Sequence, residues 1–303
     1  MSKMINSLKN RHKEHLEEKA KICLLVNGKK ECNQNCLICY LGNIGKRDPE
    51  NAFKTAQNFL RQGYMVSIGG SEPILDTDYL KAYELVEQKY ILTNGIALQQ
   101  RPALYEILLN HGINELQLSM DFDGIKGSVG ITSDILEKVI KKAKEYNFWV
   151  RIACIISPDN YLQVGRACEK AYNMGADAVY LIREMISAEE VQQRTKRFSQ
   201  ELRQNFFRVV DSTRKIYDKD KLEIRVHGNF GPKEGSAGEL LSQTNQYCRA
   251  GKKLFIVTPD DKVYPCNYLL QHPIGELIDG KLVISKELCD GNRKACCVDL
   301  LNK

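Results

Sequence analysis

Segments typical of strands and segments typical of helices alternate along most of the chain, and this alternation restricts the fold more than any other feature. Seven short apolar runs have the length of buried strands, at residues 22–26, 65–68, 90–93, 115–120, 148–156, 178–182 and 222–226. Amphipathic, helix-like segments separate them, at 50–62, 78–88, 102–110, 134–146, 160–173 and 200–218. Strands joined through helices form parallel sheets with the helices outside. Six or seven such units in about 210 residues predict an α/β fold with a partial TIM-like (β/α)6 barrel and a site on the loops that follow the strands.

The sequence changes character after residue 230. Residues 231–238 are rich in glycine, proline and serine, which is typical of a linker. Residues 254–257 and 262–265 then have the pattern of two strands around a turn, so we expect a small β-hairpin domain. This gives three predicted parts, which are a helical lead at 1–20, the barrel at 21–230 and a cysteine-bearing domain at 231–303. The last part is short and poor in apolar residues, so a bound metal group would supply stability that its core lacks.

Composition narrows the class of protein. Hydrophobic residues make up 43% and charged residues 27% of the 303 residues, and no apolar run reaches the roughly 18 residues that a membrane span needs. Residues 1–20 are polar, which argues against a secretory signal and predicts a cytoplasmic location. The net charge of +6 is not concentrated in one basic run, so nucleic acid is not a favoured partner. Eleven cysteines in a chain without an export signal indicate metal or redox chemistry.

Three of these cysteines form a compact motif directly after the first predicted strand. Cys32-x3-Cys36-x2-Cys39 places three thiols on a loop where a barrel carries its reactive groups. A structural zinc site would require a fourth ligand nearby, whereas an iron-sulfur cluster with three protein ligands keeps one iron open for a small molecule. The spacing favours an iron-sulfur cluster and leaves zinc as the alternative.

The loop from Cys32 to Tyr40 resembles the signature of the radical S-adenosylmethionine (SAM) superfamily, and further motifs follow in the same order. Gly70-Ser71-Glu72-Pro73 resembles that superfamily's Gly-Gly-Glu-Pro motif, which holds the methionyl amino group of SAM. The resemblance implies SAM contacts from residues after the later strands as well. These are Ile38 and Tyr40 near adenine, Asn94 after the third strand, Ser119 or Asp121 at the ribose, and Arg151 at the carboxylate. Arg183, at the end of the sixth strand, is a further candidate by its location.

The carboxyl-terminal segment resembles the Twitch and SPASM extensions, which bind auxiliary iron-sulfur clusters. Cys248 and Cys266 would flank the hairpin, and the remaining ligands would follow a helix, with Cys289, Cys296 and Cys297 as candidates. The count suits one auxiliary cluster, as in a Twitch domain, and leaves open which of Cys296 and Cys297 binds. The implied cofactors are therefore two 4Fe-4S clusters, one SAM-binding and one auxiliary, together with SAM.

The resemblance implies reductive cleavage of SAM to a 5′-deoxyadenosyl radical, which abstracts a substrate hydrogen atom. An auxiliary cluster offers an electron acceptor, so net oxidation is expected. The predicted substrate is a ribosomally made peptide, which would be crosslinked, converted to a thioether or epimerised, and Cys154 is a candidate hydrogen-atom donor in the last case. The alternatives are dehydrogenation of a small polar molecule such as an aminocyclitol and, less favoured, RNA modification. An external one-electron reductant such as flavodoxin or ferredoxin is implied, and no membrane partner is.

Overall fold

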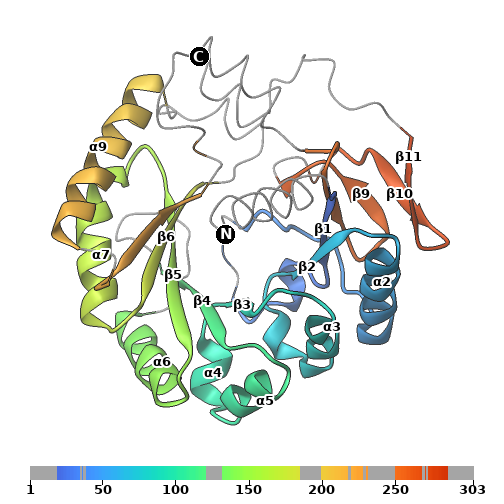
Figure 1. Cartoon of the computed structure of the whole chain (residues 1–303), viewed down its shortest axis with the longest axis horizontal. Helices are drawn as coiled ribbons and strands as arrows, with labels where there is room; N and C mark the ends of the chain where they lie inside the picture. Colours follow the sequence, from blue (N-terminus) through green and yellow to red (C-terminus); the bar gives the residue numbers. More distant parts are fainter. Residues whose placement is uncertain are drawn as a thin grey trace, which may run out of the picture.

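The computed structural model describes residues 19–34, 36, 39–120, 132–184, 199–217, 220–227, 230, 250–267, 270 and 272–285. Seven parallel strands form the wall of a partial barrel (Figure 1). They are β1 (Lys21–Leu25), β2 (Met65–Gly69), β3 (Tyr90–Thr93), β4 (Glu115–Met120), β5 (Trp149–Ile156), β6 (Ala178–Arg183) and β7 (Glu223–Val226). Strands β3 to β7 form one five-stranded sheet in chain order, and β1 pairs with β2 in a second sheet. Each strand lies within about one residue of its predicted position, which confirms the predicted α/β barrel.

Helices cover the outside of this wall, as expected for crossover connections (Figure 1). They are α2 (Pro49–Arg61), α3 (Leu80–Glu84), α4 (Ile96–Gln100), α5 (Leu104–Asn110), α6 (Ser133–Glu145), α7 (Val164–Asn173) and α9 (Gln200–Ile216). Short 3-10 helices lie at η1 (Lys29–Glu31), η2 (Pro73–Leu75), η3 (Thr77–Tyr79) and η4 (Tyr161–Gln163). Helix α2 begins where Asp48 accepts a hydrogen bond from the Asn51 amide at 2.9 Å, with Pro49 in its first turn. Within the described residues, every helix is too short or too polar to span a lipid bilayer.

The main hydrophobic core lies between the strands and these helices. On β5, Val150, Ile152, Cys154 and Ile156 belong to this core and are fully buried. Because side chains alternate across a strand, the residues between them face the barrel interior. The sheet therefore presents one apolar face to the helices and a separate face to the inside of the barrel.

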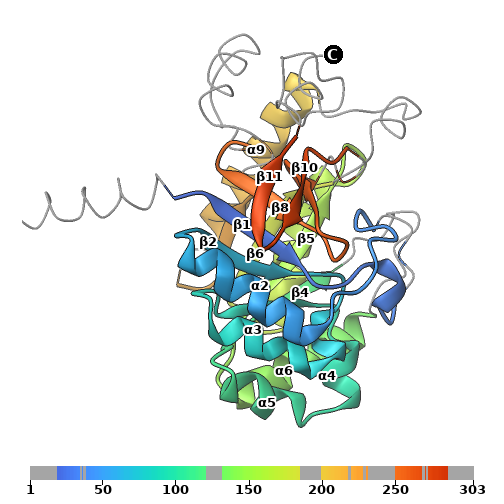
Figure 2. The same cartoon turned by 90° about the vertical axis from the view of Figure 1, so that its right-hand side faces the viewer.

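The carboxyl-terminal strands extend the barrel wall rather than forming a sheet of their own. Strand β8 (Leu254–Val257) pairs in parallel with β1, and β9 (Lys262–Tyr264) pairs antiparallel with β8, which confirms the predicted hairpin. Two further strands, β10 (Gly275–Ile278) and β11 (Lys281–Ile284), follow where we expected a helix. The resulting strand order is β11-β10-β9-β8-β1-β2, and Figure 2 shows β8 to β11 beside β1. Residues 286–303, which include the predicted ligands Cys289, Cys296 and Cys297, lie outside the described residues.

Candidate active site at the carboxyl ends of the strands

A cavity of about 210 Å³ lies at the carboxyl ends of β1 to β5. Its lining comes from the loop after β1 and from the ends of the next four strands. The lining residues are Cys32, Gln34, Cys36, Cys39, Tyr40, Leu41, Gly70, Ser71, Glu72, Leu92, Thr93, Asn94, Ser119 and Ile155. The structure thus gathers around one cavity the three motif cysteines and most of the residues that the sequence predicts for SAM. Ile38 and Asp121 lie outside the described residues, and Pro73 begins the buried helix η2 beside the cavity lining.

The cysteine loop is closed at its base by backbone hydrogen bonds. The Gly28 amide donates to the Gly45 carbonyl at 2.8 Å, and the Lys29 amide donates to the Gly42 carbonyl at 2.9 Å. Helix η1 then leads directly into Cys32. These contacts hold the two ends of the loop together at the carboxyl end of β1.

The three thiols form a donor set suited to a metal cluster. Burial raises the pKa of the Cys32 thiol, as do the nearby charges of Glu72, Cys36 and Cys39, while a hydrogen bond from the Gln34 amide at 3.4 Å opposes the shift. No three His, Cys, Asp or Glu side chains in the described parts of the chain lie close enough to hold a single metal ion. In a 4Fe-4S cluster each thiolate binds a different iron, and Cys32, Cys36 and Cys39 all line the one cavity. The residues present therefore fit an iron-sulfur cluster.

Glu72 is the one carboxylate among the described residues that line the cavity. Its side chain is fully buried, and one oxygen accepts a hydrogen bond from the Thr93 hydroxyl while the other accepts from the Asn94 amide at 2.8 Å. Burial raises the pKa of Glu72 to about 7, although both hydrogen bonds act in the opposite direction. A buried carboxylate that has two hydrogen-bond donors and, within the described parts of the chain, no ion-pair partner is suited to receive a positively charged or amino group from a ligand.

Gly70 allows the loop after β2 to approach the end of β1. A Cβ atom at Gly70 would lie 2.2 Å from Oδ1 of Asn27, so no larger residue fits without displacing Asn27. Oδ1 of Asn27 accepts a hydrogen bond from the Ser71 amide at 2.9 Å, and its Nδ2 donates to the Glu72 carbonyl at 3.3 Å. Asn27 was not among the residues predicted from the sequence, although a polar residue two positions after a buried strand was the available signal.

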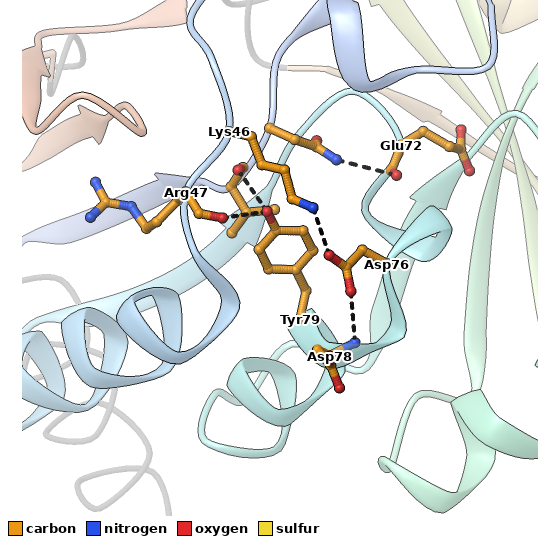
Figure 3. Close-up of polar contacts among 8 residues, drawn as sticks. Lys46, Arg47, Glu72, Asp76, Asp78 and Tyr79 are labelled. Atoms are coloured by element: carbon orange, nitrogen blue, oxygen red, sulfur yellow. Dashed lines mark hydrogen bonds and ion pairs between the residues drawn. The ribbon is translucent and has the colours of Figure 1, made fainter.

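A second set of polar contacts, shown in Figure 3, connects the cysteine loop to the Glu72 loop. The Tyr79 hydroxyl donates to the carbonyls of Val26 and Arg47, which lie before and after the cysteine loop. Lys46 forms an ion pair with Asp76 at 2.8 Å. Arg47 in turn donates to the Thr258 carbonyl at 2.6 Å, just after β8. These contacts join the cysteine loop, the Glu72 loop and the carboxyl-terminal hairpin into one frame.

The hairpin also packs against the cysteine loop through apolar side chains. Leu41 from the loop, Leu25 from β1 and Ile256 and Tyr264 from the hairpin form a small buried cluster, with Cys39 and Tyr40 packed against it. Burial raises the pKa of the Tyr40 hydroxyl, so this side chain stays neutral. Tyr40 thus lies between the cavity and the hairpin, where its ring stabilises the loop.

Asn94 and Ser119 present polar groups from the neighbouring strands. Nδ2 of Asn94 donates to Asn33 at 2.6 Å and lies 3.8 Å from the Cys32 sulfur. Ser119, near the end of β4, is exposed toward the cavity. Leu92 and Ile155 supply the apolar part of the lining. The cavity therefore combines thiols, a carboxylate, an amide, a hydroxyl and apolar side chains, which suits a ligand with an amino acid end and a less polar end.

Two predicted side chains face away from this cavity. Cys154 is fully buried in the hydrophobic core and lies next to Ile155 on the strand, so it points to the opposite face of β5. The prediction that Cys154 faces inward as a hydrogen-atom donor is therefore wrong. Arg183 lies opposite Ile156 in register, also on the core face, and its charge helps to lower the pKa of the buried Arg203, for which desolvation is the larger cause.

Arg151 lies on the inner face but is not part of the cavity lining. It is the third residue of β5, four residues before Ile155, which corresponds to about 13 Å along the strand. Its guanidinium packs on Tyr90 and Tyr180 instead. Arg151 thus contacts two tyrosine rings in the barrel interior, and its implied contact with the carboxylate of SAM stays a prediction.

Of the predicted auxiliary ligands, only Cys266 lies in the described part of the chain. It follows β9 by two residues and is partly buried. Cys248 precedes Ala250, whose bridge to Leu254 leads into β8, and is itself outside the described residues. The two cysteines therefore lie on either side of the hairpin in the chain, as predicted from the sequence.

No family model matches the sequence, and neither does any curated protein. The fold, in contrast, has clear counterparts among solved structures. Streptococcus suis SuiB bound to S-adenosylmethionine aligns with a TM-score of 0.64 at 19% identity, over 84% of this chain and 62% of that chain. Native anSMEcpe with bound AdoMet aligns with a TM-score of 0.60 at 16% identity, over 84% of this chain and 77% of that chain. Both are radical SAM enzymes, so the chain has the radical SAM fold, and it spans less than two thirds of the SuiB chain.

Proposed function

We propose that this protein is a radical SAM enzyme that modifies a peptide. One observation carries the proposal: Cys32, Cys36 and Cys39 line the same cavity as the buried Glu72 at the carboxyl ends of parallel strands. The thiols and the carboxylate come from different strand ends, so their meeting is a property of the fold and not of the sequence spacing alone. The radical SAM fold supports the same conclusion.

In this proposal the three cysteines hold a 4Fe-4S cluster through their thiolates and leave one iron for SAM. Such a cluster supplies the electron that cleaves SAM to methionine and a 5′-deoxyadenosyl radical, which abstracts a hydrogen atom from the substrate. The chain itself positions SAM. Glu72 accepts hydrogen bonds from the amino group. Gly70 has no side chain, so its backbone can approach Asn27, which holds the Ser71 and Glu72 backbone in place.

Further contacts to SAM come from the other strand ends. We assign the ribose to Ser119 together with Asp121, and the adenine to the loop that holds Ile38 and Tyr40. Asn94 bridges the cysteine loop and the Glu72 carboxylate through its side chain and its amide, so it holds the two halves of the site together. The apolar side chains Leu92 and Ile155 exclude water from the reacting end of the cavity.

A second, auxiliary cluster would be held by Cys248 and Cys266, which flank the hairpin, with Cys289 and one of Cys296 and Cys297. The hairpin strands β8 and β9, with Cys266 just after them, support this assignment. An auxiliary cluster would accept an electron from a substrate radical, so we propose net oxidation. A flavodoxin or ferredoxin would supply the electron for SAM cleavage.

The peptide substrate is supported by the solved structures with the same fold. SuiB has been solved bound to the precursor peptide SuiA, with a TM-score of 0.64 and 19% identity over 88% of this chain. The anSMEcpe structure has been solved with AdoMet and the Cp18Cys peptide, with a TM-score of 0.58 and 17% identity. Small polar molecules such as aminocyclitols remain the alternative substrate class that the sequence suggested.

Iron content and SAM cleavage test the proposal. Anaerobically reconstituted protein should contain about eight irons per chain and release 5′-deoxyadenosine from SAM after reduction. The C32A/C36A/C39A variant should retain about four irons and release none. Cys266→Ala should also retain about four irons but still cleave SAM. Wild-type protein with about four irons would contradict the auxiliary cluster, and absence of 5′-deoxyadenosine would contradict the radical chemistry.

Label transfer distinguishes the substrate classes. A deuterated peptide mixture and a deuterated aminocyclitol are each incubated with the reduced enzyme and SAM, and 5′-deoxyadenosine is analysed by mass spectrometry. Deuterium from the peptides alone is the expected result. Transfer only from the aminocyclitol would favour the small-molecule alternative.

A further inference from the structure

Arg151 faces the inside of the barrel, four residues before the cavity residue Ile155 on the same strand. In register, Arg151 lies opposite Gln117 on β4, and Gln117 lies opposite Leu92 on β3. Residues opposite one another in neighbouring strands share a face of the sheet, and Leu92 lines the cavity. Arg151 therefore points into the same interior, at a lower level than Ile155 of its own strand.

Two tyrosines enclose the Arg151 side chain. Its guanidinium carbon lies 4.1 Å from the ring centre of Tyr90 and 5.6 Å from that of Tyr180. Tyr180 lies opposite Ala153, so its ring is on the inner face as well. Such contacts attract a cation electrostatically, but only weakly in comparison with an ion pair.

The charge of Arg151 has no counter-ion among the described residues. Its side chain is buried, with 8% of the residue exposed, and its Nε atom has no hydrogen-bond partner. Glu115 shares the inner face but forms no ion pair with Arg151, and Glu223 is paired with Arg225 at 2.7 Å. Arginines that are this well buried are normally paired with an acid, because an uncompensated buried charge is costly. A buried guanidinium in a barrel interior is therefore suited to an anion that arrives with a ligand.

The carboxylate of SAM is poorly placed to be that anion. The groups that bind the amino acid end of SAM in the proposed function, Glu72 and the cysteine loop, are at the carboxyl ends of the strands. Arg151 is about 13 Å further down the strand than Ile155. A substrate between these two levels would place one end at the SAM cavity and the other at Arg151.

We propose that Arg151, held between Tyr90 and Tyr180, binds a carboxylate of the substrate and thereby fixes which substrate carbon faces the SAM cavity. This inference rests on the proposed function for the location of the reacting end. For a peptide, the carboxylate belongs to an aspartate or glutamate side chain or to the carboxyl terminus. Arg151 is thus a specificity residue for the substrate and not a SAM ligand.

Binding of small probes to the full-length, reconstituted enzyme with SAM tests this directly and requires no turnover. The side-chain probe is N-acetyl-L-glutamate α-methylamide, and N-acetyl-L-glutamine, with a free α-carboxylate, represents a chain terminus. N-acetyl-L-glutamine α-methylamide is the uncharged control. Ligand-observed NMR titrations measure the affinity in wild type, Arg151→Met, Arg151→Lys and, as a matched control, Arg61→Met, which changes an exposed arginine at the end of α2.

At least one acidic probe should bind about tenfold or more tightly than the uncharged control, and Arg151→Met should remove that preference. Arg151→Lys should retain part of it because the charge remains, whereas Arg61→Met should retain all of it. The preferred probe identifies the source of the carboxylate. Equal binding of acidic and uncharged probes to wild type, or a preference that persists in Arg151→Met, would overturn the proposal.

The affinity for SAM distinguishes a substrate contact at Arg151 from a SAM contact at Arg151. Arg151→Met should bind SAM with unchanged affinity in equilibrium dialysis, and it should unfold at no lower temperature than wild type because a buried, unpaired charge is removed. A tenfold loss of SAM affinity in a folded Arg151→Met would overturn the proposal in favour of a SAM contact. Failure of the radical chemistry itself would show in the iron and 5′-deoxyadenosine assays without affecting probe binding.

Discussion

Replacement of Glu72 by glutamine should weaken SAM binding and at the same time stabilise the protein at alkaline pH. In the proposed site the ionised carboxylate accepts hydrogen bonds from the amino group of SAM. Hydrogen bonds to a charged group contribute about 1.5–3 kcal/mol, so Glu72→Gln should raise the dissociation constant of SAM about 10- to 100-fold at pH 8. The wild-type affinity should also increase as pH rises through about 7, where Glu72 ionises, and the variant should lack this component.

The effect on stability has the opposite sign because burial opposes ionisation of Glu72. The pKa of this carboxyl rises from 4.5 to about 7 on folding, so between these values the folded state holds more protons than the unfolded state. The stability of the wild type therefore falls as pH rises across this window, by about 3 kcal/mol from this group alone. Glutamine does not titrate and is free of this loss. Its amide oxygen can still accept from the Asn94 amide, but the Thr93 hydroxyl loses a carboxylate acceptor.

Two measurements test both effects. Equilibrium dialysis gives the SAM affinity of the anaerobically reconstituted proteins at pH 6 and pH 8. Urea unfolding of the reduced, cluster-free proteins at pH 5 and pH 8 gives the stability difference between variant and wild type, in which other titrating groups cancel. Glu87→Gln, at an exposed position, is the matched control. A variant that binds SAM as well as wild type, or a stability difference that is equal at both pH values, would refute the reasoning.

Three further substitutions test the frame of the site. Gly70→Ala should destabilise the protein by about 1–3 kcal/mol and weaken SAM binding, because its methyl group displaces Asn27; urea unfolding and dialysis measure both, and an unchanged midpoint would contradict the close approach. Tyr79→Phe should lower the free energy of unfolding by about 1–2 kcal/mol, because the Tyr79 hydroxyl hydrogen-bonds to the carbonyls of Val26 and Arg47. A lower melting temperature together with faster cluster release would show this. Cys154→Ser should lower stability by burying a hydroxyl yet leave the modified product unchanged by mass spectrometry; loss of product in a folded variant would contradict its place in the core.

The positions of the strands and most helices followed from the sequence because burial imposes a period of two or of 3.6 residues. Residues 254–257 and 262–264 show this clearly, since apolar runs separated by a Pro-Asp-Asp turn can form little except a hairpin. Strands β10 and β11 were missed because they are short, largely exposed and follow no apolar pattern.

The site was predictable where one sequence motif contains several of its residues. It was less predictable where the role of a residue depends on its height along a strand or on the face of the sheet to which its side chain points. Cysteine spacing and the loop of Glu72 located most of the cavity. The partner of Arg151 could not be derived in this way, because membership of β5 says nothing about depth in the barrel. Cys154 was placed on the wrong face, since a single residue of offset along a strand reverses the direction of its side chain. Asn27 was missed because its role depends on the approach of Gly70 across the sheet.

The pairing of β8 with β1 has a consequence for the order of folding. Lys21 lies opposite Leu254, so this edge of the barrel joins residues that are roughly 230 positions apart in the chain. During synthesis, β1 leaves the ribosome early, and one edge of this strand stays unpaired until β8 has been made. The loop with Cys32, Cys36 and Cys39 acquires its packing against Ile256 and Tyr264 only at that late stage. Cluster insertion should therefore be a post-translational step that follows completion of the wall, and a nascent chain stalled before residue 254 should present an unpaired strand edge that invites aggregation.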